Sequence, residues 1–358
     1  MKQIYVQAQA DHIASLAKAA PLSALEELVW NALDADAHEV RIDLLSNSLG
    51  AVEAVRVSDD GTGIDVLKAD STFGSLGGSW KRFGEQTPAK RRLHGRHGRG
   101  RFKAFALGSH VEWRTTVRIA GELVSYTLGA DISNPGVFEL ESVPKPGPGT
   151  GTEVFISNAS ANCDSLLDAG QSVRSLAAKF ALYLKSYPDV RIFFNGLPVT
   201  PVVVQKRRAG YTLAIANGAE ARLEIIEWKC KFVGAGKLVW AGPDGFGLRE
   251  HSPGVRSGGQ PYTAYLVSPR FPALAAENAL VMEELNPEVR MYLDAAKKAL
   301  KAHFLAEIDD AIVAFKREWK QRLKSLSTAE KQALLDLVKK SLKSSTREEP
   351  AAEVVGEK

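Results

Sequence analysis

Apolar and polar residues alternate in several short runs along the first half of the chain, and this period predicts β-strands with one buried face. The runs are residues 40–45, 51–57, 111–119, 123–128, 137–141 and 152–157. Between Leu25 and Leu33 the apolar residues recur at every third or fourth position, which predicts an amphipathic helix ahead of the first strand. We therefore expect residues 1–160 to form an α/β sandwich, with helices on one face of a mixed, mostly antiparallel sheet.

A second α/β region is expected at residues 171–285, after a small, polar stretch at 159–170. Its pattern predicts a helix at 172–185 and strands at 191–194, 199–204, 222–228, 237–240 and 262–267. The glycine-rich stretch 242–259 is expected to be a functional loop or a partner surface. A C-terminal helical segment should cover 286–343, and the polar tail 344–358 is expected to be disordered. The predicted fold class is α+β.

The first helix carries a polar stripe on its otherwise apolar surface. Glu27, Asn31 and Asp34 lie at positions i, i+4 and i+7, so they share one face. An acid and an amide one turn apart could hold a divalent cation and orient a water molecule. The alternative is a solvated helix face.

Two glycine-containing motifs follow in the sequence. Asp59, Gly61 and Gly63 end the alternating run 51–57, where glycines could let the backbone approach a flat ligand while the carboxylate accepts a hydrogen bond from an exocyclic amine. The alternative for this motif is a simple turn. Gly95, Gly98 and Gly100 precede a helical run and predict an anion site at a helix N-terminus. The spacing differs from the dinucleotide-binding fingerprint, and no P-loop motif occurs in the sequence.

Taken in order, these motifs resemble the superfamily of DNA gyrase B, heat-shock chaperone ATPases, histidine kinases and MutL. The ordered signature is Glu-x-x-x-Asn-Ala-x-x-Ala, Asp-x-Gly-x-Gly-Ile and Gly-x-x-Gly-x-Gly, and residues 149–154 are similar to its threonine-bearing strand. The resemblance covers roughly residues 10–158 and is closest to MORC- and MutL-like proteins. Histidine kinases fit less well, because only ten residues precede Asp11 and a phospho-accepting hairpin would need more.

The resemblance implies a Bergerat-type ATP-binding domain with Mg²⁺ as cofactor and gives each motif a role. Glu27 would activate the attacking water, Asn31 would coordinate Mg²⁺, and Asp34 would support the phosphate end. Asp59 would bind the adenine amino group. The remaining nucleotide-binding positions implied by the resemblance are Gly61, Gly63, Gly95, Gly98, Gly100, Arg101, Lys103 and Thr152. For Lys103, a solvated side chain is the alternative.

The second region resembles the transducer domain that follows the ATPase module in gyrase B, MutL and MORC proteins. Such domains supply a basic side chain to the γ-phosphate, and Lys237, Arg249 and Arg256 are the candidates here. The lysine-rich C-terminal helix is expected to be packed. The alternative is a role in dimerisation or output near nucleic acid. The implied partner is a second copy of this chain, bound in an ATP-dependent way.

Charge and composition refine this interpretation. The net charge is +4, and residues 81–103 hold nine basic residues against one acid, Glu85. In the families of the resemblance this segment is a lid over ATP, and DNA contact is the alternative. No apolar run reaches the roughly 20 residues of a membrane span, the N-terminus has no signal-peptide core, and Cys163 and Cys230 are isolated, so we expect a cytoplasmic protein. The expected function is Mg²⁺-dependent binding and slow hydrolysis of ATP that drives lid closure and dimerisation. The alternatives are an ATP-gated binding module and a DNA-associated clamp with little hydrolysis.

Overall fold

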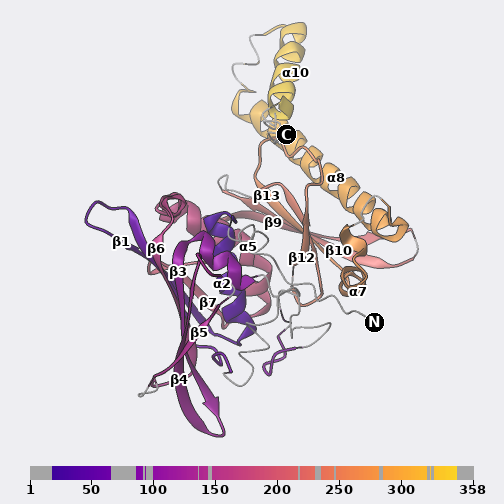
Figure 1. Cartoon of the computed structure of the whole chain (residues 1–358). Coiled ribbons are helices and arrows are strands. Elements are labelled where there is room, and N and C mark those ends of the chain that lie inside the picture. Colours follow the sequence, from indigo (N-terminus) through magenta and orange to yellow (C-terminus); the bar gives the residue numbers. More distant parts are fainter. Residues whose placement is uncertain are drawn as a thin grey trace, which may run out of the picture. The chain divides into compact units, whose positions relative to one another are not determined.

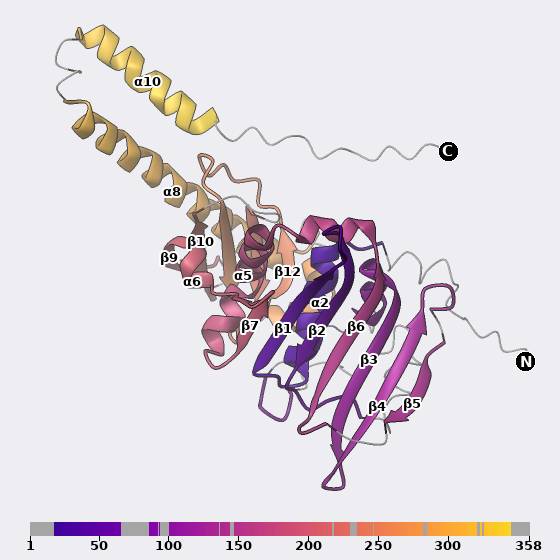
Figure 2. The same cartoon turned by 90° about the vertical axis from the view of Figure 1, so that its left-hand side faces the viewer.

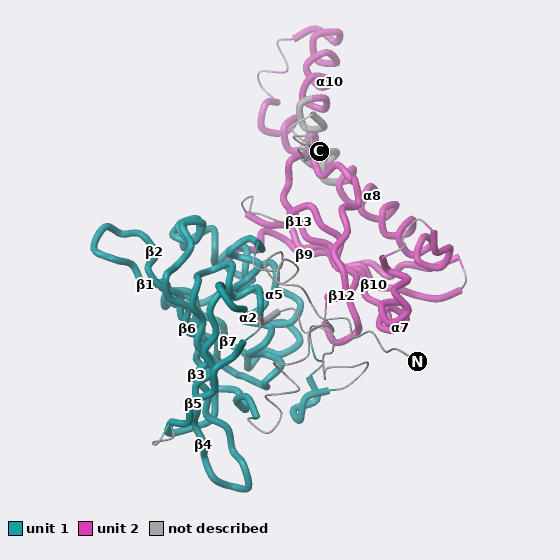
Figure 3. Tube along the Cα trace, in the orientation of Figure 1, with its two compact units in different colours: residues 1–203 teal, residues 204–358 magenta. Residues whose placement is uncertain are grey.

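The computed structural model divides the chain into two compact units, Met1–Val203 and Val204–Lys358 (Figure 3). It describes residues 18–65, 86–91, 93, 100–135, 137–143, 147–216, 218–229, 235–245, 247–281, 285–320, 323 and 326–344. Each unit is built on its own sheet. The mixed α+β fold class expected from the pattern is confirmed.

The first unit contains an eight-stranded sheet in the order β5-β4-β3-β6-β2-β1-β7-β8 (Figure 2). Its strands are β1 (Glu39–Ser46), β2 (Val52–Asp59), β3 (Gly108–Ile119), β4 (Glu122–Asp131), β5 (Glu139–Val143), β6 (Gly151–Ala159), β7 (Arg191–Phe194) and β8 (Leu197–Pro198). The neighbours are antiparallel except β1 and β7, which run parallel. The sheet is therefore mixed and mostly antiparallel, as the alternating runs predicted.

Helices cover one face of this sheet (Figures 1 and 2). The covering elements are α2 (Pro21–Asp34), α4 (Gly100–Lys103), η2 (Ala104–Ala106), η3 (Ala161–Leu166) and α5 (Ala169–Ser186). The alternation along β3 shows which face they cover, because Val111, Trp113 and Val117 are buried while Glu112 and Arg114 lie between them on the opposite face. There, Arg114 forms ion pairs with Glu112 at 2.6 Å and Glu153 at 2.9 Å. The outer face is thus a polar surface with cross-strand ion pairs, and the apolar core lies beneath the helices.

The boundary between the two units differs from the sequence expectation. Residues 171–203 were placed in the second region, whereas α5, β7 and β8 belong to the first unit. The reason is long-range pairing: β7 adds to the sheet beside β1, from Glu39 opposite Arg191 to Ile42 opposite Phe194. A local sequence pattern carries no information about this partner.

The strand expected at 199–204 is also wrong. The chain forms only the short β8 and then a helical turn, α6 (Pro201–Val204). Pro201 accounts for this change, because it has no N–H to donate to a strand ladder and its fixed φ suits the first turn of a helix.

The second unit contains a five-stranded sheet in the order β12-β11-β13-β10-β9 (Figure 1). Its strands are β9 (Gln205–Ala214), β10 (Glu220–Trp228), β11 (Lys237–Ala241), β12 (Gly247–His251) and β13 (Tyr262–Val267), and short helices follow at α7 (Phe271–Ala276) and η4 (Ala279–Val281). The pattern predicted the three inner strands and missed the two edges. Most of β9 is exposed or half-buried, so it lacks an apolar signal, and β12 lies inside the stretch that was expected to be a loop.

The long helix α8 (Pro287–Glu318) docks on this sheet through its first half. Asn286 caps it, with Oδ1 accepting the N–H groups of Glu288 at 3.0 Å and Val289 at 3.1 Å. Among the side chains of α8 that the structure describes, the last buried one is Phe304, whose ring lies 4.7 Å from that of Tyr262. The last helix, α10 (Thr328–Ser344), turns back beside the distal half of α8 (Figure 2). The predicted helical segment 286–343 is thus formed by α8 and α10. Of the predicted disordered tail 344–358, Ser344 ends α10 and residues 345–358 lie outside the described residues.

Candidate functional site

The helix α2 brings two of the expected site residues together with the third motif. Glu27 is half-buried, and the Lys103 ammonium, on α4, donates a hydrogen bond of 3.0 Å to its Oε2. Asn31 lies one turn further along α2 and is exposed. The first and third sequence motifs therefore meet in space, with a carboxylate, an ammonium and an amide on one side of α2.

Asp34, the third member of the polar stripe, lies in a different environment. Its side chain is only 9% exposed. Burial raises the pKa of Tyr183, on α5, well above the ordinary value for tyrosine, and the nearby Asp34 carboxylate adds to this rise. Asp34 is therefore a buried carboxylate near Tyr183, in contrast to the exposed Asn31.

Asp59 ends β2 as a half-buried carboxylate that is held by backbone donors. Its Oδ1 accepts the N–H of Gly61 at 2.9 Å and the N–H of Thr152 at 3.3 Å. Burial raises the pKa of Asp59 to about 6, although the two N–H groups act in the opposite direction. Within the described part of the chain Oδ2 has no hydrogen-bond partner, so this oxygen can accept a hydrogen bond from a ligand.

The glycines around Asp59 are required by close backbone contacts. A Cβ on Gly61 would lie 2.6 Å from the carbonyl oxygen of Ala35, and one on Gly63 would lie 2.2 Å from that of Thr116. Gly63 also has a φ of +75°. The motif is thus a turn packed against the end of α2 and against β3, and glycine is the residue that this packing allows.

Thr152 is buried beside Asp59 and belongs to a short polar chain on the inner face of the sheet. Its hydroxyl lies 3.1 Å from that of Thr115, which in turn accepts the N–H of Ile64 at 2.9 Å. The Tyr126 hydroxyl donates to the carbonyl oxygen of Ile64. Sequence reasoning missed Thr115 and Tyr126. Their signal was the presence of polar groups at inward-facing positions of β3 and β4 among otherwise apolar residues.

Asp60, next to the adenine-site candidate, has a structural role that the sequence did not reveal. Its Oδ1 accepts the N–H of His38 at 2.7 Å and that of Glu39 at 2.8 Å. The end of β2 is thereby tied to the connection between α2 and β1. This contact links the strand that carries Asp59 to the connection that follows the helix carrying Glu27.

A second missed cluster holds residues 86–91 against the end of α2. Asp36, at a φ of +59°, accepts the N–H of Ala89 at 3.0 Å through Oδ2 and the hydroxyl of Thr87 through Oδ1. Arg91 is 5% exposed and donates to the carbonyl oxygen of Ala37 at 2.6 Å. Arg91 is one of the nine basic residues of the segment that was predicted to be a mobile lid, but its guanidinium is buried in a structural contact.

The other residues of the third motif are described only in part. Gly95 and Gly98 lie outside the described residues, as does the side chain of Arg101. Gly100 begins α4, a single helical turn that continues as η2. Phe102 and Phe105 are buried, so the apolar side of this turn fixes the position of Lys103 beside Glu27.

The side chains near α2 that could coordinate a metal ion limit the kind of metal site that is possible. Among the described residues, no cluster of three or more His, Cys, Asp or Glu side chains has metal-site geometry. Glu27 and Asn31 are oxygen donors one turn apart, which suits Mg²⁺ when phosphate oxygens and water complete its shell. The residues present therefore fit a magnesium–nucleotide complex better than an all-protein metal site.

Comparison with known proteins agrees with this geometry. Residues 20–144, about a third of the chain, match the family model described as histidine kinase-, DNA gyrase B- and HSP90-like ATPase. This match supports ATP binding by the first unit. A search of curated proteins found no match.

A solved structure shows that a larger part of the fold is shared. A crystal structure described as the N terminal domain of a DNA repair protein aligns with a TM-score of 0.50 and 14% sequence identity. The alignment covers 83% of this chain and 98% of that chain, and at this identity the likeness concerns the fold alone. None of the described helices combines the length and apolarity needed to cross a membrane.

Proposed function

We propose that this chain binds and slowly hydrolyses ATP with Mg²⁺, and that the nucleotide acts as a conformational switch. The observation that carries the proposal is the setting of Asp59. Its Oδ1 is held by two backbone N–H groups, while Oδ2 can accept from the exocyclic amine of adenine. Guanine presents a carbonyl at that position, so the site should prefer ATP to GTP.

Glu27 is the proposed general base for the attacking water. In the structure described here it is paired with Lys103 at 3.0 Å, a contact that holds a proton donor beside the base. The γ-phosphate of ATP would compete for the Lys103 ammonium, so nucleotide binding would release the Glu27 carboxylate for catalysis. Base activation is thereby coupled to the arrival of the substrate.

The remaining roles complete the proposed site. Asn31 would bind Mg²⁺ through its side-chain oxygen, and Thr152 would support the adenine site from β6. The other proposed nucleotide-binding positions are Asp34, Gly61, Gly63, Gly95, Gly98, Gly100 and Arg101. Mg²⁺ supplies charge neutralisation of the phosphates when it is bound.

The proposed output is a change of assembly. ATP would drive lid closure and favour a homodimer in the manner of MORC- and MutL-like proteins, with the second unit acting as a transducer-like domain. This is a population shift, which requires that ATP binds the closed dimer more tightly than the open monomer. We place this activity in the cytoplasm, where ATP is available.

Two variants test the catalytic part of the proposal. Glu27→Ala should keep ATP binding and lose hydrolysis, and light scattering should show it trapped as an ATP-bound dimer. The matched control is Glu26→Ala: Glu26 lies next along α2 but pairs with Lys179 at 3.6 Å, so hydrolysis should stay near the parental rate. Parental hydrolysis by Glu27→Ala would disprove the assignment of the base.

Two other functions have some support. An ATP-gated binding module would show normal affinity for ATP, negligible turnover and a nucleotide-dependent protein partner. A DNA-associated clamp is favoured by the basic residues between 81 and 103 and by the fold shared with a DNA repair protein. DNA binding that an ATP analogue strengthens would favour the clamp.

A further inference from the structure

The distal half of α8 and the whole of α10 form a hairpin that builds no core of its own. We refer to residues 313–344 as the distal hairpin. Beyond Phe304, no side chain of α8 or α10 is buried among those that the structure describes. Val313 is 55% exposed, Trp319 38% and Leu337 64%. The docked half of α8 supports this hairpin, because His303 and Phe304 are both buried at the last contact with the sheet.

The distal hairpin is strongly basic. Residues 313–344 hold nine Lys and Arg against three Asp and Glu, a net charge of +6, whereas the remaining residues hold 37 basic and 39 acidic residues, a net charge of −2. The tail 345–358 contributes only −2 and cannot neutralise the hairpin. The hairpin is therefore, together with residues 81–103, one of two places in the sequence where positive charge is concentrated.

Three lysines in the described part of the hairpin keep their charge exposed. Two of its three acids are occupied locally, since Glu330 caps α10 by accepting the N–H of Ser327 at 2.8 Å and Asp336 accepts from Gln332 at 3.1 Å. Lys316, Lys320 and Lys340 are exposed. None of these three lysines makes an ion pair within the described ranges. Their ammonium groups are consequently available to an external anion.

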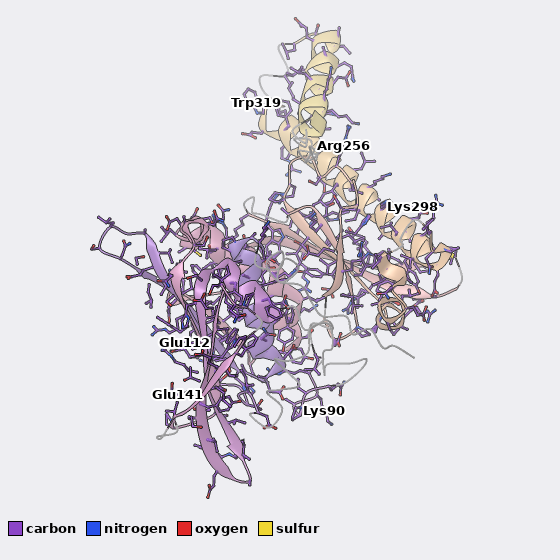
Figure 4. All side chains as sticks on the ribbon, in the orientation of Figure 1. Lys90, Glu112, Glu141, Arg256, Lys298 and Trp319 are labelled. Carbon is purple, nitrogen blue, oxygen red and sulfur yellow. The ribbon has the colours of Figure 1, made fainter. Side chains whose placement is uncertain are left out.

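An aromatic side chain lies beside these charges. Trp319 stacks on Phe315 with ring centroids 5.7 Å apart, and Lys316 lies one turn before Trp319 on the same side of α8. Figure 4 shows Trp319 on the distal part of α8, away from Lys298 on the docked half. Exposed basic residues beside an aromatic ring are the combination that binds a phosphate backbone and stacks on bases.

We propose that the distal hairpin is a nucleic-acid-binding surface that contacts the phosphate backbone through its lysines and unpaired bases through Trp319. A second copy of the hairpin is the less favourable occupant, because two surfaces of net charge +6 repel each other. A polyanion is attracted by the same charge. The proposal does not require ATP binding, so its test is made without nucleotide.

The test measures binding of fluorescein-labelled single- and double-stranded DNA by the full chain in a salt series. The variant Lys316→Gln/Lys320→Gln/Lys340→Gln removes three charges from the hairpin. If all three contact phosphates, the slope of log K against log salt should fall in magnitude by about 2–3. Trp319→Ala should weaken binding of single strands about tenfold and leave duplex binding within about threefold.

The matched control removes three charges from the docked half of the same helix, in Arg290→Gln/Lys298→Gln/Lys301→Gln. These three residues are exposed as well. The control therefore lowers the net charge of the chain by the same amount as the hairpin variant and leaves the hairpin sequence unchanged. The control should keep the parental salt slope, and circular dichroism should show that both triple variants are folded. Equal weakening by both triples, displacement of DNA by polyglutamate at equal charge, or the absence of salt-dependent binding would each overturn the proposal.

Discussion

Replacement of Asp59 by asparagine should stabilise the unliganded protein while it removes ATP binding. Burial raises the pKa of this carboxyl from 3.8 to about 6, so the folded state resists its ionisation. Asparagine keeps an oxygen that can accept the N–H groups of Gly61 and Thr152, and it carries no charge. The amide cannot replace the carboxylate as an acceptor-only partner for an adenine amino group.

The size and the pH window follow from the shift. A difference of about two pKa units corresponds to about 3 kcal/mol, at 1.36 kcal/mol per unit. Below about pH 4 the carboxyl is protonated in both states and costs nothing, whereas above about pH 6 the full cost is present. The wild type therefore loses this part of its stability as the pH rises through that window, and Asp59→Asn does not.

Urea unfolding at about pH 4 and about pH 7.5 measures the effect. The stability of Asp59→Asn relative to the wild type should be greater at the higher pH, by up to about 3 kcal/mol. The control is Asp43→Asn on the outer face of the sheet, where the carboxylate pairs with Arg56 at 3.1 Å and no gain at neutral pH is expected. A pH-independent difference for Asp59→Asn, or destabilisation at neutral pH, would refute the reasoning.

Two further substitutions test structural contacts that the sequence did not reveal. Arg91→Ala should destabilise the first unit by about 3 kcal/mol, because it removes the guanidinium and leaves the Asp36 carboxylate buried without this partner. Thermal unfolding measures the loss of stability. A loss below about 1 kcal/mol would mean that Arg91 is solvated. In the second unit, His303 lies 2.9 Å from Glu227, both side chains are 1% exposed, and this hydrogen bond lowers the pKa of Glu227. This hydrogen bond stabilises the fold at pH values above the ordinary pKa of a glutamate carboxyl, and its contribution is lost as the pH falls below that pKa. His303→Leu should therefore lower the free energy of unfolding by about 3 kcal/mol at neutral pH and by less in acid. An equal cost at both pH values, measured by urea unfolding, would contradict this.

The sequence predicted the elements whose signal is local. Alternation identified β2, β3 and β6, and the three- and four-residue period identified α2 and the C-terminal helices. These elements each have one buried face, so their apolar residues repeat with the period of the backbone. The edge strand β9 was missed because its positions 205–208 read Gln-Lys-Arg-Arg, and an edge needs fewer apolar side chains.

The sequence predicted the motifs of the candidate site, because each motif is a short run of residues and the motifs follow one another in a fixed order. The meeting of Glu27 with Lys103 depends on how α4 packs against α2, which no spacing encodes. The same limit applies to Asp36, because its partners Thr87 and Ala89 lie some fifty residues away along the chain. Long-range polar contacts of this kind are chosen by the tertiary fold, so a single sequence cannot reveal them.

The central claim is tested most directly by isothermal titration of the full chain with ATP and Mg²⁺. The account predicts one site per chain for the wild type, little or no binding of GTP, and loss of ATP binding in Asp59→Asn with the fold preserved. Equal ATP binding by Asp59→Asn would contradict the adenine site described here. No binding of ATP by the wild type would contradict the account as a whole.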